Sequence, residues 1–113
     1  MSVRSGRLKA LAVSSAKRSP AVPELPTIAQ AAFPGYEAAT WYGVLAPAGT
    51  PVPIIRKLNA EISATLNHPD LKQRMSSQGA EPAPMSPEEF GAYIKSEVTK
   101  WAMVVKESGA HVD

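Results

Sequence analysis

Two short apolar runs stand out along the first half of the chain. Residues 8–13 are apolar except for Lys9, and a Ser14–Ser15 pair follows them. Residues 40–46 are rich in aromatic and β-branched side chains and end at Pro47. Because such runs favour extended backbone, each predicts a short strand. The first run is apolar on both faces, which suits a parallel sheet covered by helices.

Apolar positions change to helical spacing after residue 50. Ile55, Leu58, Ile62 and Leu66 recur every three or four residues and predict one helix with an apolar stripe. Thr50 stands where a cap would, and the prolines at 51 and 53 fall in the first turn, where the amides would lack partners anyway. A shorter helix is expected to restart after 68–69 and to stop at Gly79.

The strongest helix start in the sequence lies at residues 86–89. Ser86 is followed by proline and then by two glutamates, which is the pattern of a capped helix start. The helix is expected to run to about Lys106 and to end at Gly109. Its apolar positions are spaced by three and four residues: Phe90, Tyr93, Ile94, Val98, Trp101, Val104 and Val105.

Proline dominates the segment between the two expected strands. Seven of the 11 prolines lie between residues 20 and 53. Proline fixes φ and pushes the preceding residue to extended backbone, so this segment should run as rigid extended pieces and turns. Residues 27–32 would allow a single helical turn, and 33–36 carry a turn signal.

Three regions follow from these patterns. Residues 1–19 would form one strand and its turn, 20–49 a proline-rich crossing segment and the second strand, and 50–113 the helices. The fold class is therefore α/β, with two short strands and two or three helices. Two strands alone make a poor sheet, which indicates that the chain is part of something larger.

Composition excludes several classes of protein. The 113 residues are 44% hydrophobic and 19% charged, a globular balance, and the net charge of +2 is too small to indicate a nucleic-acid partner. Cysteine is absent, so disulfides and thiolate metal sites are excluded. No run approaches the roughly 20 apolar residues of a membrane helix, so direct membrane insertion is not expected. The first residues lack the pattern of a secretory signal, so the chain as written would stay cytoplasmic.

No constellation for catalysis or for a bound cofactor or metal is visible. The two histidines, His68 and His111, stand 43 positions apart, and neither has a carboxylate three or four residues after it. The Ser14–Ser15 pair lacks the glycine frame of a nucleophile elbow, and no phosphate-binding glycine loop occurs. Helix capping explains Glu88 and Glu89. An enzyme is therefore not expected.

Seven short motifs in order carry a family resemblance. They read GRLKALAVSSAKRSP at 6–20, PELPTIAQA at 23–31, PGYEA at 34–38, WYGVLAPAGTP at 41–51, LNAEI at 58–62, GAEP at 79–82 and SPEEF at 86–90. With this order and spacing, the chain resembles the C-terminal part of the solute-binding receptors of tripartite tricarboxylate transporters, the Bug (TctC-like) family. The resemblance implies the C-terminal part of a two-lobed, periplasmic-binding-protein-like fold. Residues 1–19 would then hold the last strand of one lobe and its turn, 20–49 would cross back to the other lobe, and 50–113 would be the C-terminal helices.

The resemblance also implies a function. Such receptors capture small carboxylates in the periplasm and deliver them to a membrane permease. Ser14, Ser15, Trp41, Tyr42 and Gly43 would lie nearest the ligand cleft and hinge. Because the other part of the cleft lies outside the chain, binding by this chain alone is not expected.

A second interpretation stays open. The apolar faces of 55–66 and 90–105 would also suit an independent helical module for protein–protein interaction. Exposed strand edges would allow such a module, or the receptor fragment, to associate with itself.

Overall fold

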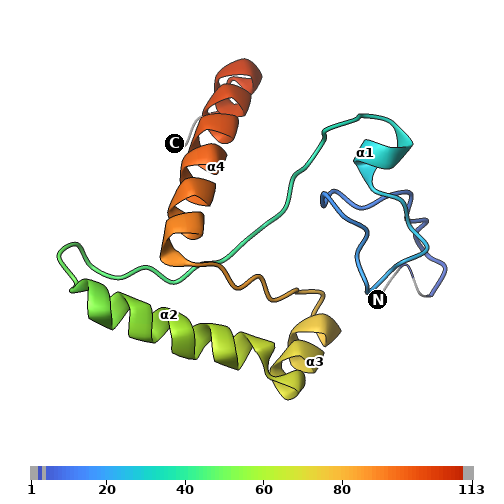
Figure 1. The fold of residues 1–113 in the computed structure, drawn as a ribbon. Helices are drawn as coiled ribbons and strands as arrows, with labels where there is room; N and C mark the ends of the chain where they lie inside the picture. Colours follow the sequence, from blue (N-terminus) through green and yellow to red (C-terminus); the bar gives the residue numbers. More distant parts are fainter. Residues whose placement is uncertain (1–2, 4, 111–113) are drawn as a thin grey trace. The chain divides into compact units, whose positions relative to one another are not determined.

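Four helices make up the regular structure in residues 3 and 5–110, the part of the chain that this computed structural model describes (Figure 1). They are α1 (Ile28–Ala31), α2 (Val52–Asn67), α3 (Pro69–Ser77) and α4 (Pro87–Ser108). The structure divides into two units, residues 1–45 with 74–80 and residues 46–73 with 81–113, and each is described by itself. The assignment of sequence regions to lobes stays a prediction.

The expectation of two strands is wrong for this chain. Across the described ranges, β pairing is limited to one isolated parallel bridge between Val13 and Thr27. Residues 39–46, which connect toward α2, run without strand structure (Figure 1). A strand is stable only when a neighbour accepts and donates its backbone hydrogen bonds, and the described residues offer none to most of these positions.

Unit one is organised around α1 and the Val13 bridge. The Val13 amide donates to the Pro26 carbonyl (2.9 Å), and the Ile28 amide donates to the Val13 carbonyl (2.9 Å). Thr27 caps α1 through a capping box, because its Oγ1 accepts from the Gln30 amide (3.1 Å) while Gln30 Oε1 accepts from the Thr27 amide (3.3 Å). Thr27 is fully buried. The single helical turn expected at 27–32 is confirmed.

The predicted turn at 33–36 is also present. The Tyr36 amide donates to the Phe33 carbonyl (3.0 Å), with Pro34 and Gly35 in the central positions. Gly35 has φ of +83°, a left-handed value that a type II turn requires at this position. The turn ends the α1 region and leads into the extended segment 37–46.

Unit two contains α2 and α4, which contact each other. The Asn59 side-chain amide of α2 donates to the Met85 carbonyl just before α4 begins (2.8 Å). The expected cap at Thr50 is wrong: Pro51 is the N-cap residue, and the Thr50 hydroxyl donates to the Pro47 carbonyl instead (2.8 Å). The hydroxyl therefore closes the turn before the helix rather than the helix itself.

The start and end of α4 match the sequence expectation. The Ser86 hydroxyl accepts from the Glu89 amide (3.1 Å), and Glu89 Oε2 accepts from the Ser86 amide (2.8 Å). The Ser86 backbone amide, and next its hydroxyl, hold the pKa of Glu89 below its usual value because both stabilise the charged carboxylate. Gly109, at φ of +68°, forms the left-handed C-cap.

Gly79 stops α3 as expected. The amides of Gly79 and Ala80 turn back to the carbonyls of Ser76 (3.0 Å) and Met75 (2.9 Å), the pair of bonds that defines a Schellman motif. Gly79 has φ of +77°, which a residue with a side chain rarely adopts. At the other end of α3, His68 is the C-cap of α2, and its backbone carbonyl accepts from the Lys72 amide (3.0 Å).

The described residues form no hydrophobic core. Among the described residues only Thr27 and Glu97 are buried, and no apolar side chain is. Burial of apolar surface is the main favourable term in folding. The helices are therefore held mainly by local interactions, and their apolar faces remain in contact with solvent.

Candidate functional site

The Ser14–Ser15 turn lies between two neighbouring segments of unit one. On one side, the residue before it is bridged to Thr27. On the other, the Ser14 carbonyl accepts from the Ala38 amide (2.9 Å). The turn is thus fixed at the start of α1 and at the start of the extended segment that carries Trp41 and Tyr42.

The two serine hydroxyls differ in what they offer a ligand. The Ser15 hydroxyl donates to the Lys17 carbonyl (2.7 Å), so its proton is used within the turn. The exposed Ser14 hydroxyl has no hydrogen-bond partner within the described part of the chain. A carboxylate needs donors, and of the two residues Ser14 is the one with a hydroxyl proton to donate.

Arg18 holds the far end of this turn. Its Nε donates to Gln30 Oε1 (3.0 Å), and one of its terminal nitrogens donates to the Pro23 carbonyl (3.2 Å). Gln30 Oε1 also accepts from the Thr27 amide, so a single amide oxygen joins the Arg18 turn to the α1 cap. Sequence reasoning missed this network. The Thr-x-x-Gln spacing at 27–30 was the available signal for its α1 part.

Trp41, Tyr42 and Gly43 lie on the extended segment beyond Ala38. Trp41 is 39% exposed and Tyr42 is 94% exposed, and Gly43 is also exposed. Trp41 follows Ala38 by three positions, so the two Cα atoms lie at most about 11 Å apart. The segment therefore starts at the serine turn, and its two aromatic rings present polarisable apolar surface with a polar tip.

Metal binding and membrane insertion have no support in the described residues. No three His, Asp or Glu side chains come together there as a metal site would require. No helix is long and apolar enough to cross a membrane. His111, considered above as a ligand, lies outside the described residues.

Comparison with protein families places the chain. Residues 1–110 match the family described as tripartite tricarboxylate transporter family receptor. This chain belongs to that family. The family is one of binding proteins, which are generally not enzymes.

Curated relatives share the sequence over nearly the whole chain. A protein from the tcbD–tcbE intergenic region of Pseudomonas sp. (strain P51) is 42% identical over 102 residues, covering 89% of this chain and 30% of the relative. Protein BugT of Bordetella pertussis is 39% identical over 108 residues, covering 96% of this chain and 33% of BugT. The chain therefore spans about a third of the length of these relatives.

Solved structures also match this chain over nearly its whole length. Rpa4515 of R. palustris, determined with adipate, is 39% identical with a TM-score of 0.76, over 96% of this chain and 36% of the other. The periplasmic binding protein BugD matches with a TM-score of 0.75 and 39% identity, over 96% and 37%. MatC of Rhodopseudomonas palustris, with bound malate, is 35% identical with a TM-score of 0.68, over 92% and 36%.

Proposed function

We propose that this chain supplies the C-terminal third of a solute-binding receptor that captures small carboxylates in the periplasm for a membrane permease. The observation that carries the proposal is the joint match in sequence and fold to Rpa4515, which was solved with adipate, over 96% of this chain. MatC, solved with malate, supports dicarboxylates as the ligand class. The remaining two-thirds of such a receptor would supply the rest of the fold and of the cleft.

The serine turn is the proposed contact for a ligand carboxylate. The Ser14 hydroxyl is exposed and unpartnered within the described residues. The adjoining backbone amides of Ser15 and Ala16 also donate to no group in the described part of the chain. One hydroxyl and two amides would provide three donors for a carboxylate, and bonds from several donors to an anion are stronger than bonds between neutral groups.

The aromatic segment is the proposed contact for the carbon chain of the ligand. Trp41 and Tyr42 would cover methylene groups, while Gly43 would let the backbone approach closely. Ser15 has a positioning role, because its hydroxyl closes the turn that presents Ser14. These roles rest on the geometry of unit one and on the family.

The chain alone should not bind. A ligand site normally buries most of its ligand in a concave pocket, and Tyr42 is almost fully exposed here. Three exposed donors compete with water for the carboxylate, and their net gain is small. Closure by the other part of the receptor would exclude that water.

A receptor chimera tests the proposal. In the chimera, this chain replaces the matching 36% of Rpa4515, and calorimetry measures adipate and malate binding to the chimera and to the chain alone. We expect micromolar binding of at least one dicarboxylate by the chimera and none by the chain. Micromolar binding by the chain alone would contradict the proposal, as would a folded chimera that binds no carboxylate in a wider panel.

Matched variants of the chimera test the residue roles. Ser14→Ala removes the free donor and should weaken binding about tenfold, the size expected for one hydrogen bond to a charged group. Val44→Ala, on the extended segment that carries Trp41 and Tyr42, is the control and should leave affinity within about twofold. If Val44→Ala lowered the affinity as much as Ser14→Ala, the proposed role of Ser14 would be wrong.

The interaction-module interpretation stays a prediction. The exposed helix faces are compatible with it, but no observation favours it over membership in a receptor. Its measurable consequence, self-association, is part of the experiment in the next subsection.

A further inference from the structure

The apolar stripe of α4 changes character halfway along the helix. The helix has 22 residues, a length of about 33 Å. In its first half, the stripe residues Phe90 and Ile94 are half-buried. In its second half the same stripe is exposed, at residues Val98, Trp101, Val104 and Val105. These four residues are called the distal stripe below.

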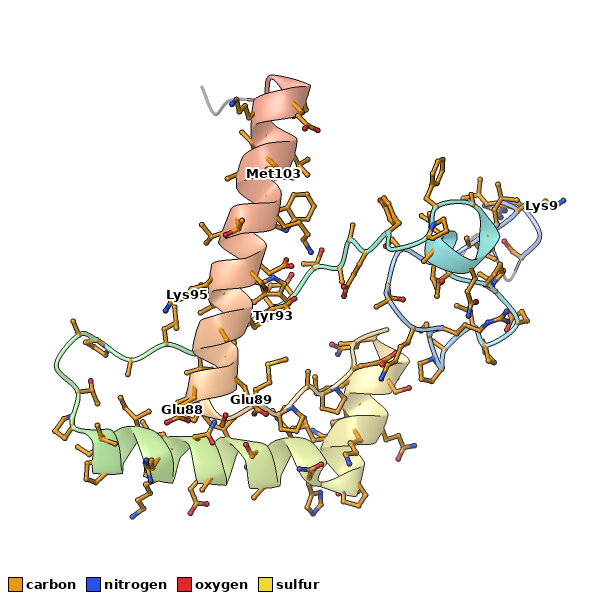
Figure 2. All side chains as sticks on the ribbon, turned by 45° about the horizontal axis from the view of Figure 1, so that its top comes forward. Lys9, Glu88, Glu89, Tyr93, Lys95 and Met103 are labelled. Carbon is orange, nitrogen blue, oxygen red and sulfur yellow. The ribbon has the colours of Figure 1, made fainter. Side chains whose placement is uncertain are left out.

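The distal stripe is a single face and not scattered exposure. At 100° per residue, its four side chains fall within an arc of about 120°. The opposite side of the helix carries Lys95, Thr99, Lys106 and Glu107. Figure 2 shows Lys95 and Tyr93 projecting from opposite sides of α4, which separates the polar side from the side of the stripe. A helix with this division buries its apolar face against another element.

A polar cluster around the buried Glu97 marks the point where the half-buried and exposed halves of the stripe meet. Glu97 is only 7% exposed, and its Oε2 accepts from the Trp101 indole Nε1 (3.0 Å). Lys100 forms an ion pair with Glu97 and lies 5.5 Å from the centre of the Trp101 ring. These contacts fix the Trp101 side chain at the start of the exposed half. An ordered aromatic ring is a better docking anchor than a mobile one, because less conformational entropy is lost on binding.

We infer that the distal stripe is a docking surface for the part of the receptor that this chain does not contain. The inference rests on the proposed function and adds to it the surface through which the two parts join. The occupant follows from the comparisons. BugD superposes on 96% of this chain with a TM-score of 0.75, yet the match takes up 37% of BugD, so 63% of that receptor remains to cover exposed apolar faces. Continuity with the half-buried Phe90–Ile94 end of the stripe favours an intramolecular surface of the complete receptor.

Co-expression with the complementary part of a receptor tests the inference. The tagged 63% of BugD that lies outside the match is co-expressed with this chain, and the complex is isolated and its dissociation constant measured. Val105→Lys places a charge on the distal stripe and should weaken association about 100-fold, because a buried unpaired charge is costly. Met103→Lys is the matched control. At 100° per residue Met103 falls on the side of α4 opposite the distal stripe, and it is exposed, so this substitution should leave association within about twofold.

A second readout does not depend on assembly from two pieces. In the receptor chimera, Val105→Lys should lower the melting temperature by several degrees, whereas Met103→Lys should leave it unchanged. Adipate binding is recorded separately, so a chimera that shows this stripe effect but binds no carboxylate refutes the proposed function and keeps the docking surface.

Three results would overturn the inference. The first is that the wild-type chain and the BugD remainder fail to associate. The second is that the two variants weaken association equally, and the third is that Val105→Lys leaves both readouts unchanged. A fourth concerns the occupant: if the chain alone forms a dimer that Val105→Lys dissociates, and the BugD remainder does not displace it, a second copy is the partner.

Discussion

The start of α4 and the extended segment 39–46 differ in where their hydrogen-bond partners lie. At the start of α4, Ser86 and Glu89 satisfy each other's backbone amides across three residues of sequence. In the extended segment, the amides of residues 42–46 have no partner in the described part of the chain. Both regions carry a clear sequence pattern. The helix forms because its hydrogen-bond partners lie a few residues away, whereas the expected strand has no such local partners and does not form.

The difference indicates what kind of molecule this chain is. Helices close their hydrogen bonds within one segment, so they form even where little apolar surface is buried. Strands need a neighbour, and the apolar side chains of residues 44 and 45 remain about three-quarters exposed. A sequence that specifies strands and does not form them fits a chain that spans a third of its relatives.

The largest expected effect comes from proline in the extended segment. Val44→Pro removes one backbone donor that is unused in the chain alone, so the helicity and the melting curve of the chain should not change. In the receptor chimera, the same substitution should destabilise the fold by about 3 kcal/mol or more, because it would remove a ladder hydrogen bond. Circular dichroism and thermal melting of both proteins measure this.

Val44→Thr is the control for that prediction. It keeps the backbone donor and the β-branched side chain, so it should affect both proteins little. If Val44→Pro destabilises the chain alone, the segment already has a partner there, and the contrast between the two regions fails.

An intermediate effect is expected at the helix start. Ser86→Ala removes one acceptor and should cost about 1 kcal/mol, equally in the chain and in the chimera, because both partners are local. Denaturant titration of helicity measures it. Ser96→Ala is the matched control: the Ser96 hydroxyl donates to the Tyr93 carbonyl inside the helix, so its loss should be neutral or slightly favourable. A loss confined to the chimera would show that the cap depends on distant contacts.

The smallest effect is a pH dependence. The pKa of Glu89 is lowered from 4.5 by its bonds to Ser86, so this contribution to stability is fully present above pH 4.5. It is lost as pH falls through the lowered pKa of the folded state. Helicity of the chain should therefore decrease below about pH 4.5. Glu89→Gln should flatten that decrease, and Glu88→Gln should retain it. An unchanged profile in Glu89→Gln would contradict the role of this carboxylate.

The helices could be predicted from the sequence because their signals are local. Ser86, Gly79 and Gly109 act through backbone groups a few residues away, and all three occupy the expected cap positions. Thr50 shows the limit of such reasoning. Its hydroxyl could either cap α2 or bond within the turn before the helix. It donates to the Pro47 carbonyl and so does not cap α2. The strand prediction failed because a strand's backbone hydrogen bonds need a neighbouring segment, and the described residues supply only the Val13–Thr27 bridge.

The sequence indicated where the serine turn lies along the chain but not how its hydroxyls are used. The sequence put a serine pair directly after an extended run, and the structure fixes that pair beside Thr27 and Ala38. It did not indicate that the Ser15 hydroxyl donates to the Lys17 carbonyl within the turn, whereas the Ser14 hydroxyl donates to no group in the described residues. The Arg18–Gln30 bond joins residues twelve apart and follows from no local rule. The ligand roles of the five candidate residues remain predictions.

Hydrogen exchange of the backbone amides of residues 42–46 separates a chain that leaves these donors unpaired from one that already pairs them. We expect unprotected exchange in the chain alone and exchange slowed about 1,000-fold or more in the folded receptor chimera, where a neighbouring strand would accept these bonds. Protection of these amides in the isolated chain, or their free exchange in a folded chimera, would contradict it.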